Sequence, residues 1–190
     1  MNYLFFDCET NGLPSDYKDI TTYPRITQFA FQVYNEQGNI TAQLCELIKP
    51  DGWTIPETEF FIKQGFTTEI NNEKGVPISF VIEKFINAEK ECNYRIAHNM
   101  MFDSMCVRNE LQKMGLNNEF LSKKFCTMRE STNICKIPSK NGRGFKWPTL
   151  SELHISLFGN DFDGAHDALA DIKATAKCFF ELKRKGIIKI

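Results

Sequence analysis

The sequence contains no long apolar run, no closely paired cysteines and no excess of basic charge. No apolar run approaches the roughly 20 residues that a membrane-spanning helix needs, and no signal peptide precedes the first apolar stretch, so we expect a cytoplasmic protein without a membrane partner. The seven cysteines are odd in number and scattered, without C-x-x-C spacing. This pattern argues against a disulfide framework or a zinc site and favours reduced thiols.

The net charge of −1 gives no electrostatic sign of a nucleic-acid partner. It does not exclude one, because a cluster of carboxylates at a metal site would offset basic residues elsewhere. Internal repeats and low-complexity segments are also absent. The length of 190 residues favours one domain over residues 1–190, and the 17 phenylalanines predict an aromatic-rich core.

The hydrophobic pattern predicts a mixed sheet flanked by helices. Turn chemistry in Asn35–Asn39 predicts a hairpin, and Thr149 with Glu152 forms a capping box that begins a helix ending at Gly159. The order of elements, with an antiparallel hairpin first, favours an α/β fold. The predicted strands are 3–6, 26–34, 40–48, 94–97 and 125–128, and the predicted helices are short ones within 56–75 and longer ones from 77, from about 103 to 114, from 149 to 159 and from about 167 to 185.

The first predicted strand brings two carboxylates to its carboxyl end. Residues two apart on a strand point to the same face, so Asp7 and Glu9 project together. Two anions held side by side at the end of a buried strand are typical of a site for a hard cation.

Two further acidic residues lie where they can join this pair. Asp103 lies in the first turn of the helix that follows the strand ending at His98, and Asp171 lies one turn into the last helix, beside an apolar stripe. A carboxylate bordering such a stripe needs a partner, because a buried charge is costly unless it is paired or bound to metal. His166 lies just before that helix on a loop that starts at Asp163 and Gly164.

This set of side chains predicts a metal-dependent hydrolase. Four carboxylates suit Mg²⁺ or Mn²⁺, and two such ions about 3.5–4 Å apart form the clamp used for phosphodiester hydrolysis. The imidazole of His166 would accept the proton of the attacking water.

Three sequence motifs resemble those of the DEDDh 3′–5′ exonucleases, a family that includes the proofreading subunit of bacterial DNA polymerase III. The motifs are 7–13 (DCETNGL), 98–103 (HNMMFD), and His166 separated by four residues from Asp171. The resemblance implies an RNase H-like fold, with metal ligands at Asp7, Glu9, Asp103 and Asp171 and a general base at His166. It also implies that Thr10 and Leu13 hold the terminal nucleotide, with Asn99 and Phe102 near the substrate. Cys8 and Asn11 differ from common family choices.

The residues themselves agree with a nucleic-acid substrate. Gly12 would let the backbone approach a sugar or phosphate, and Leu13 and Phe102 offer apolar surfaces for bases. Six basic side chains could follow the phosphate backbone: Lys123, Lys124, Lys136, Lys140, Arg143 and Lys146. The basic segment 135–148 is either a surface loop or an arm over a substrate groove, and its role stays open.

The leading hypothesis is an exonuclease acting on the 3′ end of single-stranded DNA. The first alternative is an exoribonuclease of the same family, because the 2′-hydroxyl is sensed by fine pocket geometry that sequence does not show. A second is a non-catalytic module that binds nucleic acid beside a polymerase, and a third is an accidental grouping of acidic residues. Any polymerase partner would be a separate chain, and the oligomeric state stays open.

Overall fold

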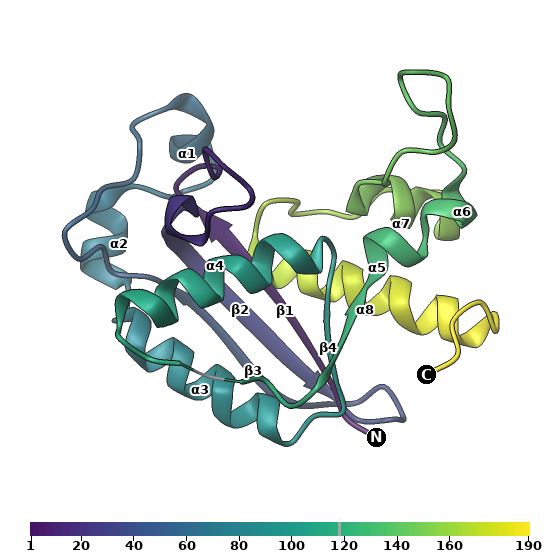
Figure 1. The fold of residues 1–190 in the computed structure, drawn as a ribbon, viewed down its shortest axis with the longest axis horizontal. Coiled ribbons are helices and arrows are strands. Elements are labelled where there is room, and N and C mark those ends of the chain that lie inside the picture. The colour runs from purple at the N-terminus through teal and green to yellow at the C-terminus, as the bar shows by residue number, and fades with distance from the viewer. Residues whose placement is uncertain (118) are drawn as a thin grey trace.

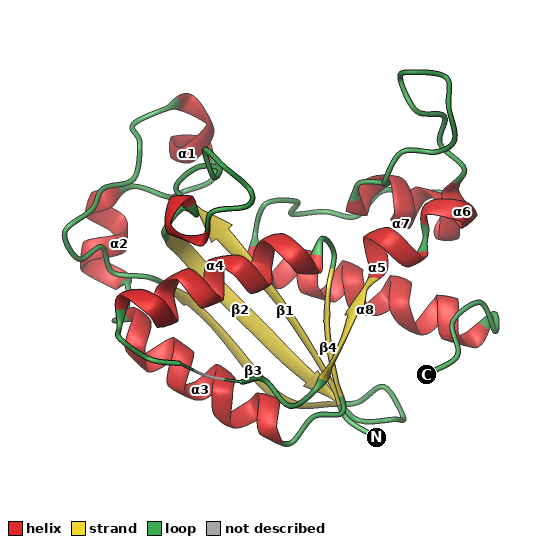
Figure 2. Cartoon of the chain, in the orientation of Figure 1, coloured by secondary structure: helices red, strands yellow, loops and turns green. Residues whose placement is uncertain are grey.

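The computed structural model describes residues 1–117 and 119–190, which form a five-stranded sheet with helices on both faces (Figure 1; Figure 2). The strand order is β3-β2-β1-β4-β5, so β1 is the central strand. β1 pairs antiparallel with β2 and parallel with β4, while β3 and β5 form the two edges. The mixed α/β sheet predicted from the sequence is confirmed. The strands are β1 Tyr3–Thr10, β2 Ile26–Tyr34, β3 Ile40–Leu47, β4 Tyr94–Ala97 and β5 Lys123–Cys126.

The helices follow the predicted order, with extra short ones between the main elements. The α7 capping box is present, since the Thr149 hydroxyl accepts from the Glu152 N–H and the Glu152 carboxylate accepts from the Thr149 N–H. None of the described helices is both long and apolar enough to cross a membrane. The helices are η1 Ile20–Thr22, α1 Glu59–Lys63, α2 Thr68–Lys74, α3 Ile78–Lys90, α4 Met100–Lys113, α5 Thr127–Glu130, α6 Thr132–Cys135, α7 Leu150–Phe158 and α8 Ala168–Arg184.

Three predicted boundaries are wrong by two residues or more. The first strand, expected at 3–6, extends to Thr10, so Asp7 and Glu9 lie within β1. The helix expected from about Asp103 begins at Met100, because Asn99 takes a left-handed backbone (φ 77°) and turns the chain directly from β4 into α4. The strand expected at 125–128 is Lys123–Cys126, because Thr127 already starts α5.

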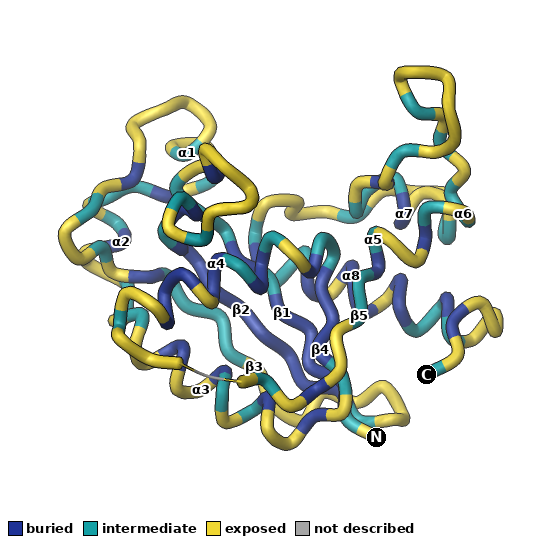
Figure 3. Tube along the Cα trace, viewed as in Figure 1, coloured by how far each residue is buried: buried dark blue, intermediate teal, exposed yellow. Residues whose placement is uncertain are grey.

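The sheet separates two hydrophobic cores. Because successive side chains of β1 point to opposite faces of the sheet, they belong alternately to one core and to the other. Leu4 and Phe6 pack in the core that includes Phe85 of α3 and Val107 of α4, whereas Tyr3 and Phe5 pack against α8. Figure 3 shows the central strands buried between these layers. Because Asp7 and Glu9 share the parity of Tyr3 and Phe5, they fall on the α8 side, at the strand's carboxyl end.

Candidate metal centre and active site

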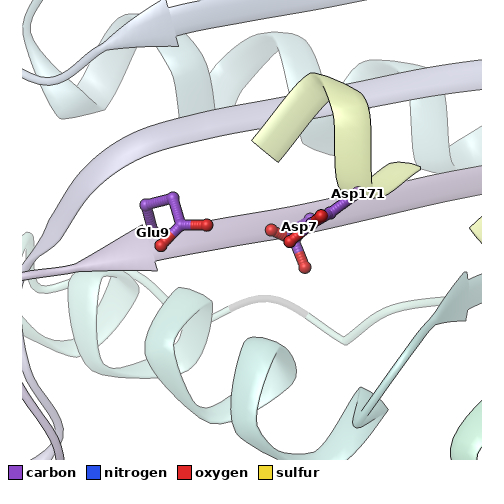
Figure 4. Close-up of side chains that lie close together, drawn as sticks. All are labelled: Asp7, Glu9 and Asp171. Atoms are coloured by element: carbon purple, nitrogen blue, oxygen red, sulfur yellow. The ribbon is translucent and has the colours of Figure 1, made fainter. Parts of the chain in front are cut away.

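The carboxylates of Asp7, Glu9 and Asp171 meet where β1 ends and α8 begins (Figure 4). Each offers an oxygen, and the three oxygens lie within 4.8 Å of one another. All three residues are partly buried. The sequence prediction that Asp171 faces the β1 pair is confirmed.

Asp171 carries the clearest sign of a cation site. Its Oδ1 is buried and has no hydrogen-bond partner among the described residues. A buried carboxylate oxygen without a partner is costly, and a cation bound among these oxygens would remove that cost. An all-oxygen donor set of this kind fits a hard divalent cation such as Mg²⁺ or Mn²⁺.

Burial and mutual repulsion oppose ionisation of the cluster. Burial, and then the charges of Asp103, Asp171 and Glu9, hold the pKa of Asp7 well above its ordinary value. The pKa of Glu9 is raised to about 7 by burial and by Asp171 and Asp167. Burial, with a smaller contribution from Asp167, raises the pKa of Asp171 to about 6, although the backbone N–H of His166 stabilises its charged form. The same repulsion that raises these pKa values would be relieved by a cation.

Asp103 approaches the site from α4 and contacts β1 beyond the part of that strand that pairs with β4. It is buried, and its Oδ1 accepts a 3.2 Å hydrogen bond from the Cys8 backbone N–H. The pairing of β1 with β4 covers Tyr3 to Phe5 only, which leaves the later N–H groups of β1 on this side without a strand partner. Asp103 is not part of the group formed by the Asp7, Glu9 and Asp171 oxygens. Its charge is nevertheless the second largest cause of the raised Asp7 pKa, after the burial of Asp7 itself.

Gln28 of β2 fixes the start of α8, a role that the sequence analysis missed. Its Nε2 donates to Asp167 Oδ2 at 3.0 Å, and its Oε1 accepts from the Ala168 N–H at 2.9 Å. Asp167 is the helix N-cap, with Oδ1 accepting from the Ala170 N–H. Because Gln28 pairs with Glu9 in the sheet register, one side chain links the β1 carboxylates to the helix that carries Asp171.

His166 lies in a turn just before α8, with an exposed side chain and a left-handed backbone (φ 71°). Its ring packs edge-on against the Phe60 ring of α1, with centroids 5.5 Å apart. The sequence analysis also missed this contact of Phe60, because nothing in the sequence indicates that the short helix beginning at residue 59 lies near the loop at residue 166.

His98, by contrast, has a structural role. Its Nδ1 lies 3.0 Å from Thr127 Oγ1, and its Nε2 lies 3.0 Å from the Pro148 carbonyl oxygen. Burial lowers its pKa to about 4, so the ring is neutral near pH 7. His98 thus ties the end of β4 to Thr127 and to the segment that ends at Pro148.

The candidate substrate residues line the exit of β1 and the start of α4. The Thr10 hydroxyl donates to the Gly12 carbonyl at 2.8 Å, and Leu13 is 74% exposed. A Cβ built at Gly12 would meet none of the described protein atoms within 4 Å. The space beside the Gly12 backbone is therefore open to a ligand. Phe102 is half-buried against Tyr23, and Asn99 makes no side-chain capping bond.

The basic segment 135–148 projects from the body as a hairpin-like arm (Figure 1). Pro138 and Phe145 form a bridge, and the Lys146 ammonium pairs with the Glu152 carboxylate at 2.6 Å. The arm is thus tied to α7 at its base.

The chain is similar to known exonucleases in sequence and in structure. The model of the Exonuclease family matches residues 4–179. The chain is similar in structure to E. coli exonuclease I in complex with a dT13 oligonucleotide, with a TM-score of 0.74 and 18% identity over 96% of this chain and 41% of that chain. It is also similar to exonuclease I from Methylocaldum szegediense, with a TM-score of 0.69 and 19% identity over 97% of this chain and 40% of that one. The chain spans about two fifths of the length of these structures.

No curated protein matches it in sequence. The sheet and these neighbours identify an α/β fold of the RNase H-like type.

Proposed function

Because the chain belongs to the Exonuclease family, we propose that it is a metal-dependent 3′–5′ exonuclease that removes nucleotides from the 3′ end of single-stranded DNA. The observation that carries the proposal is the cluster of Asp7, Glu9 and Asp171, in which the buried Oδ1 of Asp171 has no hydrogen-bond partner in the part of the chain that the structure describes. Asp103 completes the proposed ligand set from α4.

The four carboxylates would hold two divalent ions, Mg²⁺ or Mn²⁺. When bound, the ions would activate the attacking water and stabilise the leaving oxygen. The protein's own contribution is to fix the ligands on rigid elements. β1 sets the spacing of Asp7 and Glu9, and the Gln28 contacts hold the first turn of α8, where Asp171 lies.

His166 is the proposed general base. A neutral imidazole accepts a proton from the attacking water and is worth about 10²–10⁴-fold in rate when well placed. The loop before α8 and the exposed position of the ring leave it room to swing toward a bound substrate. The edge-on contact with Phe60 is then the resting position of the ring.

The terminal nucleotide would lie against Thr10, Gly12 and Leu13, with Asn99 and Phe102 opposite. An exposed leucine beside an open glycine backbone supports a wedge that closes one end of the pocket, which suits an exonuclease rather than an internal cutter. DNA is favoured as substrate because the similar E. coli exonuclease I is bound to an oligodeoxynucleotide. RNA remains the second candidate substrate.

Digestion of oligonucleotides labelled at the 5′ or the 3′ end tests the proposal. With Mg²⁺, a 5′-labelled single strand should give a descending ladder, and EDTA should stop the reaction. Asp7→Asn should abolish turnover, whereas Asp51→Asn, at an exposed aspartate, should digest like the wild-type protein. Comparing DNA with RNA of the same sequence decides between the two substrates. An inactive wild-type protein that still binds single strands would favour the non-catalytic alternative.

A further inference from the structure

A groove lies between α4 and the β5–α5 segment, with a volume of about 400 Å³. Figure 1 shows α5 following β5 beside the amino-terminal half of α4. Met101, Met105 and Phe125 supply apolar surface, and Arg108, Lys124 and Arg129 supply charge. We refer to this feature as the methionine groove.

The three cations of the groove have no carboxylate partner among the described residues. No salt bridge within 4.0 Å joins Arg108, Lys124 or Arg129 to an acidic group, although Glu130 lies in the same lining. The pKa of Lys124 is lowered by burial and then by the charges of Arg108 and Arg95. Lys124 and Arg108 therefore repel each other within the groove, and a polyanion bound there would neutralise that repulsion.

The apolar part of the lining suits a ligand without a fixed sequence. Methionine side chains are flexible and polarisable, so they adapt to surfaces of different shape. Arg129 lies over the Trp147 ring at 5.5 Å, and its Nη2 lies 4.0 Å from the Met101 sulfur. Trp147, which is 57% exposed, lies next to the groove through this contact with Arg129, and exposed aromatic rings can stack on bases.

The groove lies on the helix that supplies Asp103, at the carboxyl ends of β4 and β5. Met100 and Met101, which line it, directly follow Asn99, and Asp103 lies within one turn of Met101 on the same helix. Arg108 lies two turns farther along α4 from Met101. Because the parallel strands β1, β4 and β5 have their carboxyl ends at the same edge of the sheet, a nucleic-acid strand that leaves the carboxylate cluster could continue along α4 through the groove.

We propose that the methionine groove binds the part of a nucleic-acid single strand that lies 5′ of the bond being cut, with Arg108, Lys124 and Arg129 contacting phosphates. This inference rests on the proposed function, since it places the remainder of that substrate.

Binding of a 5′-fluorescein-labelled dT12 strand in EDTA tests the groove without turnover. Arg108→Ala/Arg129→Ala should weaken binding at least tenfold at low salt. It should also reduce the slope of log K against log salt by about 1.4, because each phosphate contact on a single strand contributes about 0.7. Lys90→Ala, at an exposed residue of α3 outside the groove, is the control and should bind like the wild-type protein. Met101→Glu, which puts a carboxylate in the groove, should weaken binding of dT12 as well.

Substrate length separates this inference from the proposed function. With Mg²⁺, the double variant should lose kcat/KM on dT12 and keep the wild-type rate on a dinucleotide, which does not reach beyond the active site. Unchanged dT12 binding in both groove variants would overturn the groove assignment and leave the exonuclease proposal standing. A wild-type protein that digests no strand would overturn the exonuclease proposal, while the binding comparison would still decide the groove. Competition by poly-glutamate as strong as that by oligo-dT at equal charge would overturn the assignment to nucleic acid.

Discussion

Neutralising Glu9 should stabilise the metal-free protein. Ionised Glu9 lies partly buried beside Asp171 and Asp167, which is why its pKa is about 7 rather than 4.5. At about 1.4 kcal/mol for each pKa unit, the difference between 4.5 and about 7 corresponds to about 3 kcal/mol of unfavourable ionisation. Because the side chain retains some exposure, solvent screening reduces this value, and we expect Glu9→Gln to gain about 1–2 kcal/mol at pH 8 in EDTA.

The sign of the pH dependence follows from the raised pKa. Glu9 binds its proton more tightly in the folded than in the unfolded state, so its contribution to stability is complete below about 4.5 and is lost as pH rises through about 7. The advantage of Glu9→Gln should therefore be present at pH 8 and vanish near pH 4.5. The pKa of Asp171, raised to about 6, adds to the same trend in both proteins.

Urea denaturation followed by circular dichroism at pH 8 and pH 5, with EDTA, measures this difference. Glu57→Gln, at an exposed glutamate, is the matched control and should leave stability unchanged at both values. Added Mg²⁺ should stabilise the wild-type protein more than Glu9→Gln, because the variant lacks a ligand. A destabilised Glu9→Gln at pH 8, or a gain of equal size at pH 5, would refute the reasoning.

The other predictions concern activity and the packing that supports the site. His166→Ala should lower kcat about 10²–10⁴-fold and leave Mg²⁺ affinity unchanged; a near-normal kcat in single-turnover assays would mean that another base acts. Gln28→Leu removes the contacts that hold the start of α8, so kcat should fall while thermal unfolding shows a loss of about 1–3 kcal/mol; unchanged kcat would exclude the positioning role. Glu110→Gln weakens the ion pair between buried Glu110 and partly exposed Arg25 (2.8 Å) and should cost about 1–3 kcal/mol in urea denaturation; unchanged stability would show that the pair contributes nothing. Ca²⁺ in place of Mg²⁺ should support little turnover in the ladder assay, because its larger, looser coordination misplaces the attacking water.

The sequence predicted those parts of the site that depend on local periodicity. The two-residue spacing of Asp7 and Glu9 sets their common face once β1 is a strand, and the 3.6-residue period of α8 turns Asp171 toward the sheet. The Thr149 capping box was recognisable for the same reason, since it depends on four consecutive residues.

The parts that the sequence did not predict depend on contacts between distant segments. Gln28 reaches Asp167 only because the β1–β2 register places Gln28 opposite Glu9, and a glutamine within a buried strand carries no local sign of such a role. The contact between Phe60 and His166 likewise joins segments that only the tertiary fold brings together. The early start of α4 was missed because the left-handed turn occurs at an asparagine, not at a glycine.

The order of the proposed ligands along the chain bears on when the metal site can form. The Asp7–Glu9 pair is translated well before Asp171, which belongs to α8, and α8 docks on β1 only after the rest of the sheet has been translated. A nascent chain that stops before α8 has two of the three clustered carboxylates, lacks the Gln28 contact to Asp167, and exposes Phe5 where α8 would cover it. Such a chain would therefore fold poorly and would lack the third carboxylate of the proposed metal site.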